Sequence, residues 1–293
     1  MTSTHETFFL GADGGGSGCR IALARVAGSG GFEVLADARG ASANVTSDFD
    51  GAIAALGGTI LDAARSAGVD IATVRAHCGL AGVLDTGIAA RVADALPIRN
   101  VTVSDDRETS VVGALGGENG TVISIGTGSF IGRSVDGVQT FIGGWGFRLG
   151  DQASGAWLSR ALLIDALLCH DKMLPPSGLL TDVLTEFSNR PQDVVAFGQT
   201  ARPGDIAAYA PRIVDAAKAG DAAAQNLMQR GAGYVTRALG ALGTGGAEPI
   251  CVVGGLGPAF APYLPAERAA QITDAKGNAL DGALRLAAAG GKV

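Results

Sequence analysis

The sequence predicts an α/β protein built from two related halves. Apolar, strand-like runs alternate with segments of helical spacing, which is typical of sheets covered by helices. A pattern of strand, glycine-rich turn and strand occurs first at Phe8–Val26 and again at Thr121–Gly137. We interpret this recurrence as an internal repeat in which each half opens with a glycine hairpin.

The elements of the first half follow from their residue patterns. Phe8–Asp13 and Cys19–Val26 are expected to be paired strands, and 32–38 a third strand. From Asp48 the apolar residues recur with helical spacing until Gly68, a residue suited to ending a helix. The remaining expected elements are a strand within 75–82, a helix around 88–96, a strand at 100–104 and a helix that opens near Asp106.

After Thr121–Gly137 the second half becomes mainly helical. A strand at Pro249–Gly255 interrupts the helices, and Asn278–Ala289 is expected to be a closing helix. The predicted amphipathic stretches lie near 151–169, 203–218 and 221–243. No proline- or serine-rich linker marks a boundary, so the repeat places the domains. We expect an N-terminal domain of 1–116 plus 277–293 and a C-terminal domain of 117–276.

Composition limits the classes of function. Of the 293 residues, 28 are acidic and 22 are Lys or Arg, and the net charge of −6 argues against nucleic-acid binding. No basic leader and no uninterrupted apolar run of membrane-spanning length occurs, so neither a signal peptide nor a membrane span is expected. The four cysteines are widely spaced and the three histidines have no metal-like partners. These features favour a reduced, cytoplasmic protein.

Three glycine-rich turns, each after a predicted strand, are the candidate binding loops. They lie at Asp13–Gly18, Gly126–Ser129 and Gly254–Gly257. Glycine lets backbone N–H groups approach an anion, and open α/β sheets bind ligands at the carboxyl ends of their strands. An ordinary hairpin is the alternative for the first turn. Neither GxxxxGK[ST] nor GxGxxG occurs, which leaves nucleotide binding by two opposed hairpins.

These turns match, in order and spacing, the phosphate-1, phosphate-2 and adenosine motifs of the actin-like/hexokinase ATPase superfamily. Ser42–Ser47, Ser104–Gly117, Ser124–Ser129 and Gly143–Leu158 narrow the resemblance to the BadF/BadG/BcrA/BcrD ATPase family. Within that family the chain most resembles bacterial N-acetylglucosamine and glucosamine kinases, over essentially its whole length. The resemblance implies an actin-like ATPase (ribonuclease H-like) fold of two duplicated domains with a central interdomain cleft.

The resemblance also implies a reaction, namely ATP-dependent phosphorylation of the 6-hydroxyl of N-acetylglucosamine or a related amino sugar. ATP and Mg²⁺ would be the cofactors. Asp106 matches the family's general base, and its neighbour Asp105 stands where Asn or Ser is more common. Asp106 could instead cap the helix that it opens. Asp13 would hold the Mg²⁺ ion through water.

The remaining residue roles are carried over from the motifs. ATP and its phosphates are assigned to Asp13, Gly15, Gly16, Ser17, Gly126, Thr127, Gly128, Ser129, Gly254 and Gly255. The sugar is assigned to Asn44, Gly82, Asp106, Thr127, Gly144, Trp145 and Asp151. Asn44 could instead form a turn, Asp151 could cap a helix beginning at Gln152, and Trp145 could be a core residue. Gln152 stands where many relatives have glutamate, which leaves the identity of the sugar open.

One rival function comes from the same family, whose ATPases activate 2-hydroxyacyl-CoA dehydratases or benzoyl-CoA reductase. Such a protein shares an iron–sulfur cluster across a dimer and needs suitably placed thiolates. The segment before Gly126 contains no cysteine. A sugar-sensing regulator would carry an appended helix-turn-helix, which we do not find. We therefore expect an amino-sugar substrate, no nucleic-acid or membrane partner, and an oligomeric state that could include a homodimer.

Overall fold

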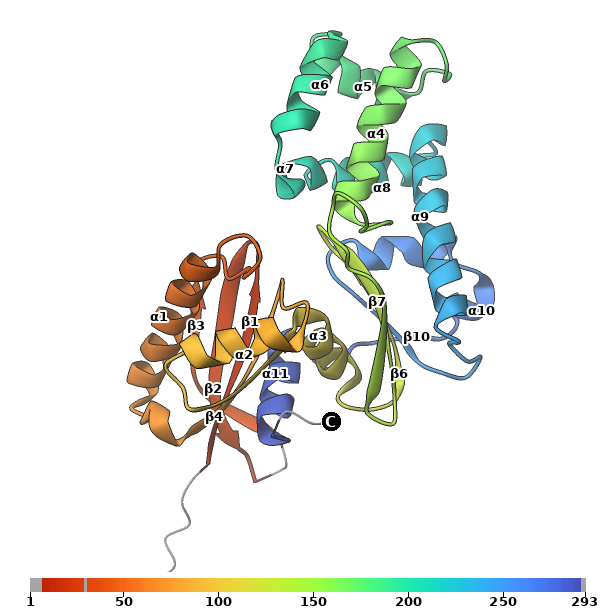
Figure 1. The fold of residues 1–293 in the computed structure, drawn as a ribbon. Helices are drawn as coiled ribbons and strands as arrows, with labels where there is room; N and C mark the ends of the chain where they lie inside the picture. The colour runs from red at the N-terminus through yellow and green to blue at the C-terminus, as the bar shows by residue number, and fades with distance from the viewer. Residues whose placement is uncertain (1–6, 29–30, 291–293) are drawn as a thin grey trace, which may run out of the picture. The chain divides into compact units, whose positions relative to one another are not determined.

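The computed structural model describes residues 7–28 and 31–290. Contacts divide these residues into two compact units (Figure 1). Unit 1 comprises the described residues of Met1–Asn119, Ser134–Gln139 and Ala275–Val293, and unit 2 comprises Gly120–Arg133 and Thr140–Asp274. The sequence placed the divisions at 116/117 and 276/277. The segment Ser134–Gln139 belongs to unit 1, and the Asp136 N–H donates to Asn119 Oδ1 at 2.7 Å.

Unit 1 is a five-stranded sheet with helices on both faces, and its strand order is β3-β2-β1-β4-β5. Its strands and helices are β1 (Phe8–Gly15), β2 (Gly18–Val26), β3 (Phe32–Gly40), α1 (Phe49–Ala67), the 3₁₀ helix η1 (Ile71–Thr73), β4 (Val74–Leu80), α2 (Thr86–Ala95), β5 (Asn100–Asp105), α3 (Asp106–Leu115) and α11 (Ala279–Ala288). Strand β1 pairs antiparallel with β2 and parallel with β4.

Alternating side chains of β1 explain the two layers of helices. Leu10 belongs to the core cluster that includes Leu56 and Ile60 of α1, whereas its neighbour Phe9 packs with Leu284 of α11. Successive strand residues point to opposite faces, so α1 and α11 cover opposite sides of the sheet. Helix α11 approaches closely because Gly11 has no side chain: an added Cβ would lie 2.9 Å from the Leu280 carbonyl oxygen.

The second sheet has the strand order β10-β9-β6-β7-β8. Its strands, and the helices that follow them, are β6 (Gly120–Ile125), β7 (Ser129–Val135), β8 (Val138–Gly143), α4 (Gly155–His170), α5 (Gly178–Glu186), α6 (Pro191–Thr200), α7 (Pro203–Ala207), α8 (Ala210–Lys218), α9 (Ala222–Ala241), β9 (Ile250–Val253), the 3₁₀ helix η2 (Gly257–Tyr263), α10 (Ala266–Ala269) and β10 (Ile272–Thr273). If the five strands of each sheet are numbered from one in chain order, both sheets have the strand order 3-2-1-4-5. This equivalence confirms the predicted duplication.

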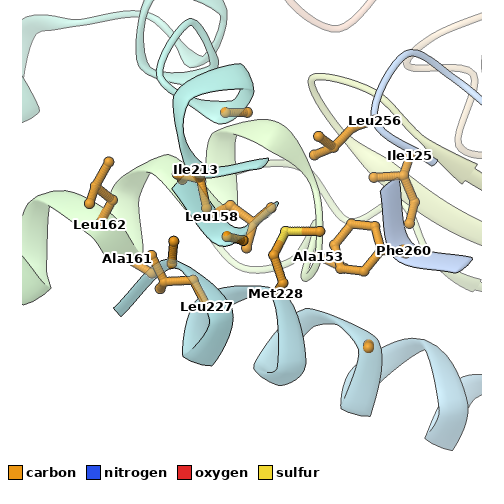
Figure 2. Packing of buried hydrophobic residues seen from close by; sticks show 14 of the residues in the cluster. Ile125, Ala153, Leu158, Ala161, Leu162, Ile213, Leu227, Met228, Leu256 and Phe260 are labelled. Carbon is orange, nitrogen blue, oxygen red and sulfur yellow. The ribbon is translucent and has the colours of Figure 1, made fainter. Parts of the chain in front are cut away.

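Helices α4, α8 and α9 and η2 enclose the main core of unit 2. Figure 2 shows Leu158, Leu227, Met228 and Phe260 meeting in this cluster, and all four are buried. Gly231 of α9 leaves room for the Phe260 ring, since an added Cβ would lie 2.6 Å from it. This core supports the loops that precede α4 and follow β9.

The expected elements of the first half are present, with Asp48 capping α1 at its start and Gly68, at φ 67°, ending it. In the second half the sequence did not predict β8, α5 or α6. The helix expected near 151 begins at Gly155 instead. Among the described residues, no helix combines the length and the apolar character needed to cross a membrane.

Candidate active site

The first glycine turn leaves its backbone open on one side. Strand β1 ends at Gly15 and β2 begins at Gly18, so Gly16 and Ser17 form the turn. A Cβ added to Gly15 or Gly16 would meet nothing within 4 Å. Gly14 differs, because its Cβ would lie 2.7 Å from Leu80. Close packing explains Gly14, whereas Gly15 and Gly16 are glycines that the fold does not require.

Two loops assigned to the sugar by resemblance are bonded to this turn. The Gly15 carbonyl accepts the Ala43 N–H at 3.0 Å, and the Gly14 carbonyl accepts the Ala81 N–H at 2.8 Å. The loops that carry Asn44 and Gly82 therefore lie beside the first turn. Unit 1 thus brings three separate segments of the sequence together at the ends of β1 and β4.

Asn44 forms a turn and still has a free amide group. Its Oδ1 accepts the N–H groups of Thr46 at 3.0 Å and Ser47 at 3.2 Å. Gly82 adopts φ 92°, and its carbonyl accepts the Thr46 hydroxyl at 3.1 Å. The Asn44 Nδ2 has no partner within the part of the chain that the structure describes, so it can donate to a bound hydroxyl group. The turn and the sugar role are therefore compatible.

Asp105 and Asp106 occupy different environments although they are neighbours. Asp105 caps α3: its carboxylate accepts the Arg107 N–H at 2.9 Å and the Arg107 Nε–H at 2.6 Å. Asp106 is the first residue of the helix. Burial raises its pKa to about 7, and the negative charges of Asp105 and Asp13 add to this effect. A carboxyl group with such a pKa can exchange a proton near neutral pH.

A buried histidine supports the strand that carries this pair. His77 of β4 lies between two hydroxyl groups of β5, with Nδ1 2.8 Å from Thr102 Oγ1 and Nε2 2.9 Å from Ser104 Oγ. The Ser104 hydroxyl in turn donates to the Asp105 carbonyl at 3.0 Å. Burial lowers the pKa of His77 to about 4, so the ring is neutral at physiological pH. No sequence pattern indicated this network.

Asp13 is suited to an indirect metal contact. It lies opposite Arg20, whose Nη2 is 2.5 Å from Asp13 Oδ2, and its side chain is 20% exposed. Its other oxygen, Oδ1, has no partner among the described residues. No group of three metal-ligating side chains occurs in the described ranges 7–28 and 31–290. Mg²⁺ commonly keeps several waters and uses one or two carboxylates, so Asp13 fits a hydrated ion.

The second glycine turn contains both exposed residues and residues that hold the fold. Gly126 has open space where a Cβ would be, and Thr127 is exposed. Ser129 is only 5% exposed, and its hydroxyl donates to the Gln152 carbonyl at 2.6 Å. The structure therefore uses the Ser129 side chain to hold the 150–154 loop, a role that the sequence did not indicate.

The third turn packs against the second. Gly254 has φ 83°, and the Ile125 carbonyl accepts the Leu256 N–H at 3.0 Å. Beside it lies a cavity of about 590 Å³ with mainly apolar walls. Its lining includes Val214, Lys218, Met228, Gly255, Leu256 and Tyr263. Of these, Gly255 and Leu256 lie in the third glycine turn that the sequence singled out, and the other four belong to α8, α9 and η2, which the fold brings together.

The residues of the sugar loop in unit 2 surround Gly128 and Ser129. Gly144, at φ 75°, donates its N–H to the Ser129 carbonyl at 2.9 Å. Trp145 is 70% exposed, so it is not a core residue. Asp151 is buried, and a Cβ on Gly128 would lie 2.9 Å from Asp151 Oδ2.

The Asp151 carboxylate does not cap a helix. Ser154 caps α4, accepting the Trp157 N–H at 3.1 Å, so the alternative of an Asp151 cap is wrong. Burial raises the pKa of Asp151, while hydrogen bonds from the N–H groups of Gly146 and Ser129 oppose this rise. The carboxylate is thus held by backbone groups beside the second glycine turn.

The chain matches a known protein family over most of its length. The model of the BadF/BadG/BcrA/BcrD ATPase family matches residues 10–259. The chain belongs to this family. It is 30% identical to glucosamine kinase GspK of Vibrio cholerae over 284 residues, which is 96% of this chain and 95% of that protein. The match covers both units and all three glycine turns.

Solved structures show how this BadF/BadG/BcrA/BcrD family member folds. A candidate N-acetylglucosamine kinase from Chromobacterium violaceum is 28% identical, with a TM-score of 0.85 over 96% of this chain and 99% of that one. Another from Porphyromonas gingivalis is 18% identical, with a TM-score of 0.70 over 95% of this chain and 97% of that one. The predicted actin-like ATPase fold of two duplicated α/β halves is confirmed.

Three of the four thiols of this family member are core residues, and Cys169 of α4 is half-buried. Cys19, Cys78 and Cys251 are buried. Burial raises the pKa of Cys78 to about 12, which keeps it protonated at neutral pH. Iron–sulfur clusters are held by thiolates, so these positions do not fit the ligand set of an activator ATPase.

Proposed function

We propose that the protein is an ATP-dependent kinase that phosphorylates the 6-hydroxyl of N-acetylglucosamine, glucosamine or a closely related amino sugar. The relatives named as glucosamine and N-acetylglucosamine kinases support the substrate class. The proposed mechanism rests on a difference between two neighbouring carboxyl groups. Asp105 is bonded to Arg107, whereas the pKa of Asp106 is about 7.

Asp106 acts as the general base in this proposal. Its carboxylate accepts the proton of the sugar hydroxyl while that oxygen attacks the γ-phosphorus of ATP. The new P–O bond forms in line with the breaking bond to the β-phosphate oxygen, so the products are the sugar 6-phosphate, ADP and a proton. A pKa near 7 lets Asp106 accept this proton and release it to water afterwards.

The phosphates are bound mainly by backbone groups. Gly15, Gly16 and Gly126 have open space where a side chain would be, so a phosphate can approach the backbone of both turns, and Thr127 is exposed. N–H groups that are already oriented stabilise developing negative charge without reorganising. Mg²⁺, held through water by Asp13, would neutralise phosphate charge when bound. The neighbouring 590 Å³ cavity has the apolar walls that suit an adenine ring.

The residues assigned to the sugar offer polar groups and an apolar face. The free Nδ2 of Asn44 donates to one hydroxyl, and the Asp151 carboxylate accepts from others. The exposed indole of Trp145 offers an apolar face to the ring. Gly82 and Gly144 both adopt positive φ, which glycine tolerates, and so shape the loops that carry these groups.

The deciding experiment is ADP release from Mg-ATP with N-acetylglucosamine, glucosamine, glucose or no sugar. We expect release that depends on an amino sugar, is absent with the 6-deoxy analogue, and falls at least about 100-fold in Asp106→Asn. Asp62→Asn, which changes an exposed carboxylate of α1, is the matched control. Turnover of ATP without sugar, or near-normal turnover in a folded Asp106→Asn, would reject the proposal. Sugar-independent turnover would favour an activator ATPase instead.

A further inference from the structure

A polar groove in unit 2 lies outside the residues assigned to catalysis. It has a volume of about 500 Å³ and lies between the start of α4 and one stripe of α9. Gly233 leaves space in its lining, and the side chains that define it here are Gln152, Trp157, Gln229, Arg230, Tyr234 and Arg237. No acidic residue is among its lining residues.

The two arginines give the polar groove its chemistry. Arg230 is oriented by Asp165, with Nη1 3.4 Å from Oδ2, and its guanidinium lies 5.5 Å from the centre of the Trp157 ring. Arg237 has no ion-pair partner within the described part of the chain. Guanidinium groups bind phosphate through paired N–H donors, and amide and aromatic side chains suit the hydroxyls and the ring of a sugar.

Two contacts connect the polar groove to the proposed sugar loops. The Tyr234 hydroxyl lies against Gly143, where an added Cβ would be 2.9 Å from it, and Gly143 precedes Gly144 and Trp145. Gln152 lines the groove, and its carbonyl accepts the Ser129 hydroxyl at 2.6 Å. A ligand in the groove would therefore touch one residue that lies against Gly143 and another that is bonded to Ser129.

The loop at residues 151–153, which carries Gln152, has an unusual backbone. Asp151 and Ala153 adopt φ 57° and 72°, a left-handed conformation that is uncommon for residues other than glycine. Gln152 lies between them. Such a segment is held by its surroundings, so its geometry responds to what its neighbours contact.

We propose that the polar groove is an effector site for a phosphorylated amino sugar, and that its occupancy changes turnover through Gln152 and the 151–153 loop. The phosphate binds Arg237 and Arg230, and the sugar hydroxyls bind Gln229 and Gln152. The effect on turnover rests on the proposed kinase function, whereas binding to the groove does not. The reaction product and other hexosamine phosphates share this chemistry.

Binding is tested first, without ATP. The chain has two tryptophans, so Trp145→Phe leaves Trp157 in the groove as the sole indole reporter. Saturating N-acetylglucosamine occupies the proposed catalytic sugar site. Glucosamine 6-phosphate, N-acetylglucosamine 6-phosphate, glucosamine 1-phosphate and inorganic phosphate are then titrated. We expect the hexosamine phosphates to change Trp157 fluorescence, and Kd to rise at least about tenfold when Arg237→Ala is added. Arg99→Ala, an exposed arginine in unit 1, should leave Kd unchanged.

Kinetics then test the link to turnover. In the wild-type protein the hexosamine phosphate should inhibit noncompetitively with respect to the amino sugar. The Arg237→Ala variant should lose this noncompetitive inhibition while keeping its KM for the sugar. Absence of binding, equal binding by inorganic phosphate, or no effect of Arg237→Ala would overturn the effector site. If no kinase activity exists but binding depends on Arg237, the kinase proposal fails and the binding site stands.

Discussion

Gly254 packs directly against the carbonyl group of Ile125. A Cβ at residue 254 would lie 2.3 Å from the Ile125 oxygen, and the residue adopts φ 83°, which side chains also disfavour. This contact joins the turn after β9 to the end of β6, immediately before Gly126. The third glycine turn therefore positions the second.

Gly254→Ala should destabilise the protein and weaken ATP binding. We expect a loss of about 1–3 kcal/mol, because the methyl group meets backbone that cannot move aside and the residue keeps a strained φ. Gly255→Ala is the matched control, since its Cβ would meet nothing within 4 Å. Thermal unfolding should show a lower Tm for Gly254→Ala alone. Equal Tm values for the two variants would contradict this role.

Gly16→Ala should weaken ATP binding without lowering the stability of the protein. The added methyl group has open space around it in the fold, so Tm should stay within about 1 °C of wild type. The same methyl group would obstruct a phosphate against the turn, and we expect the KM for ATP to rise at least about tenfold. An unchanged KM would show that no phosphate approaches Gly16.

The glycine turns could be found from the sequence because local residue patterns encode them. Strands ending in glycine are recognisable along the chain, and so is the repeat that produces two sheets of equivalent order. The sequence could not separate Gly14, which packs against Leu80, from the open Gly15 and Gly16. That difference depends on β4, which is distant in the sequence.

The polar residues required the three-dimensional structure for the same reason. Asp105 and Asp106 are both plausible caps in the sequence, and only the Arg107 contact shows that Asp105 is the cap. The alternative that Asp151 caps a helix was wrong because Ser154, three residues later, caps α4. The apolar cavity beside Gly255 was not predicted, since three separate elements form it.

Asp105→Asn should shift the pH dependence of catalysis without removing it. Asparagine still caps α3, but the variant loses a negative charge that raises the pKa of Asp106 and frees the Arg107 cation, which lowers it. Both effects lower the pKa of the base. The acidic limb of kcat/KM for the sugar, expected near pH 7 in wild type, should therefore move down by about one unit. The exposed-carboxylate variant Asp62→Asn should leave the limb in place, and an upward shift in Asp105→Asn would refute the assignment.

Asp106→Asn should stabilise the protein at alkaline pH while removing activity. The Asp106 pKa rises from 3.8 to about 7 on folding, so the folded chain retains a proton that the unfolded chain releases. The resulting contribution to stability is fully present below pH 3.8 and is lost as the pH rises through 7. Above that, the folded state contains a buried carboxylate next to Asp105 and Asp13.

Asparagine carries no such charge, so the variant avoids this loss. The Tm of Asp106→Asn minus that of wild type should therefore increase from pH 5 to pH 8, by about 3 °C or more. Thermal unfolding followed by circular dichroism at both pH values measures this difference. Asp62→Asn, with its carboxylate in solvent, should show the same difference at both. If the Asp106→Asn difference were also independent of pH, Asp106 would be ionised in the folded protein throughout this range, and its proposed role as a base that titrates near neutral pH would be wrong.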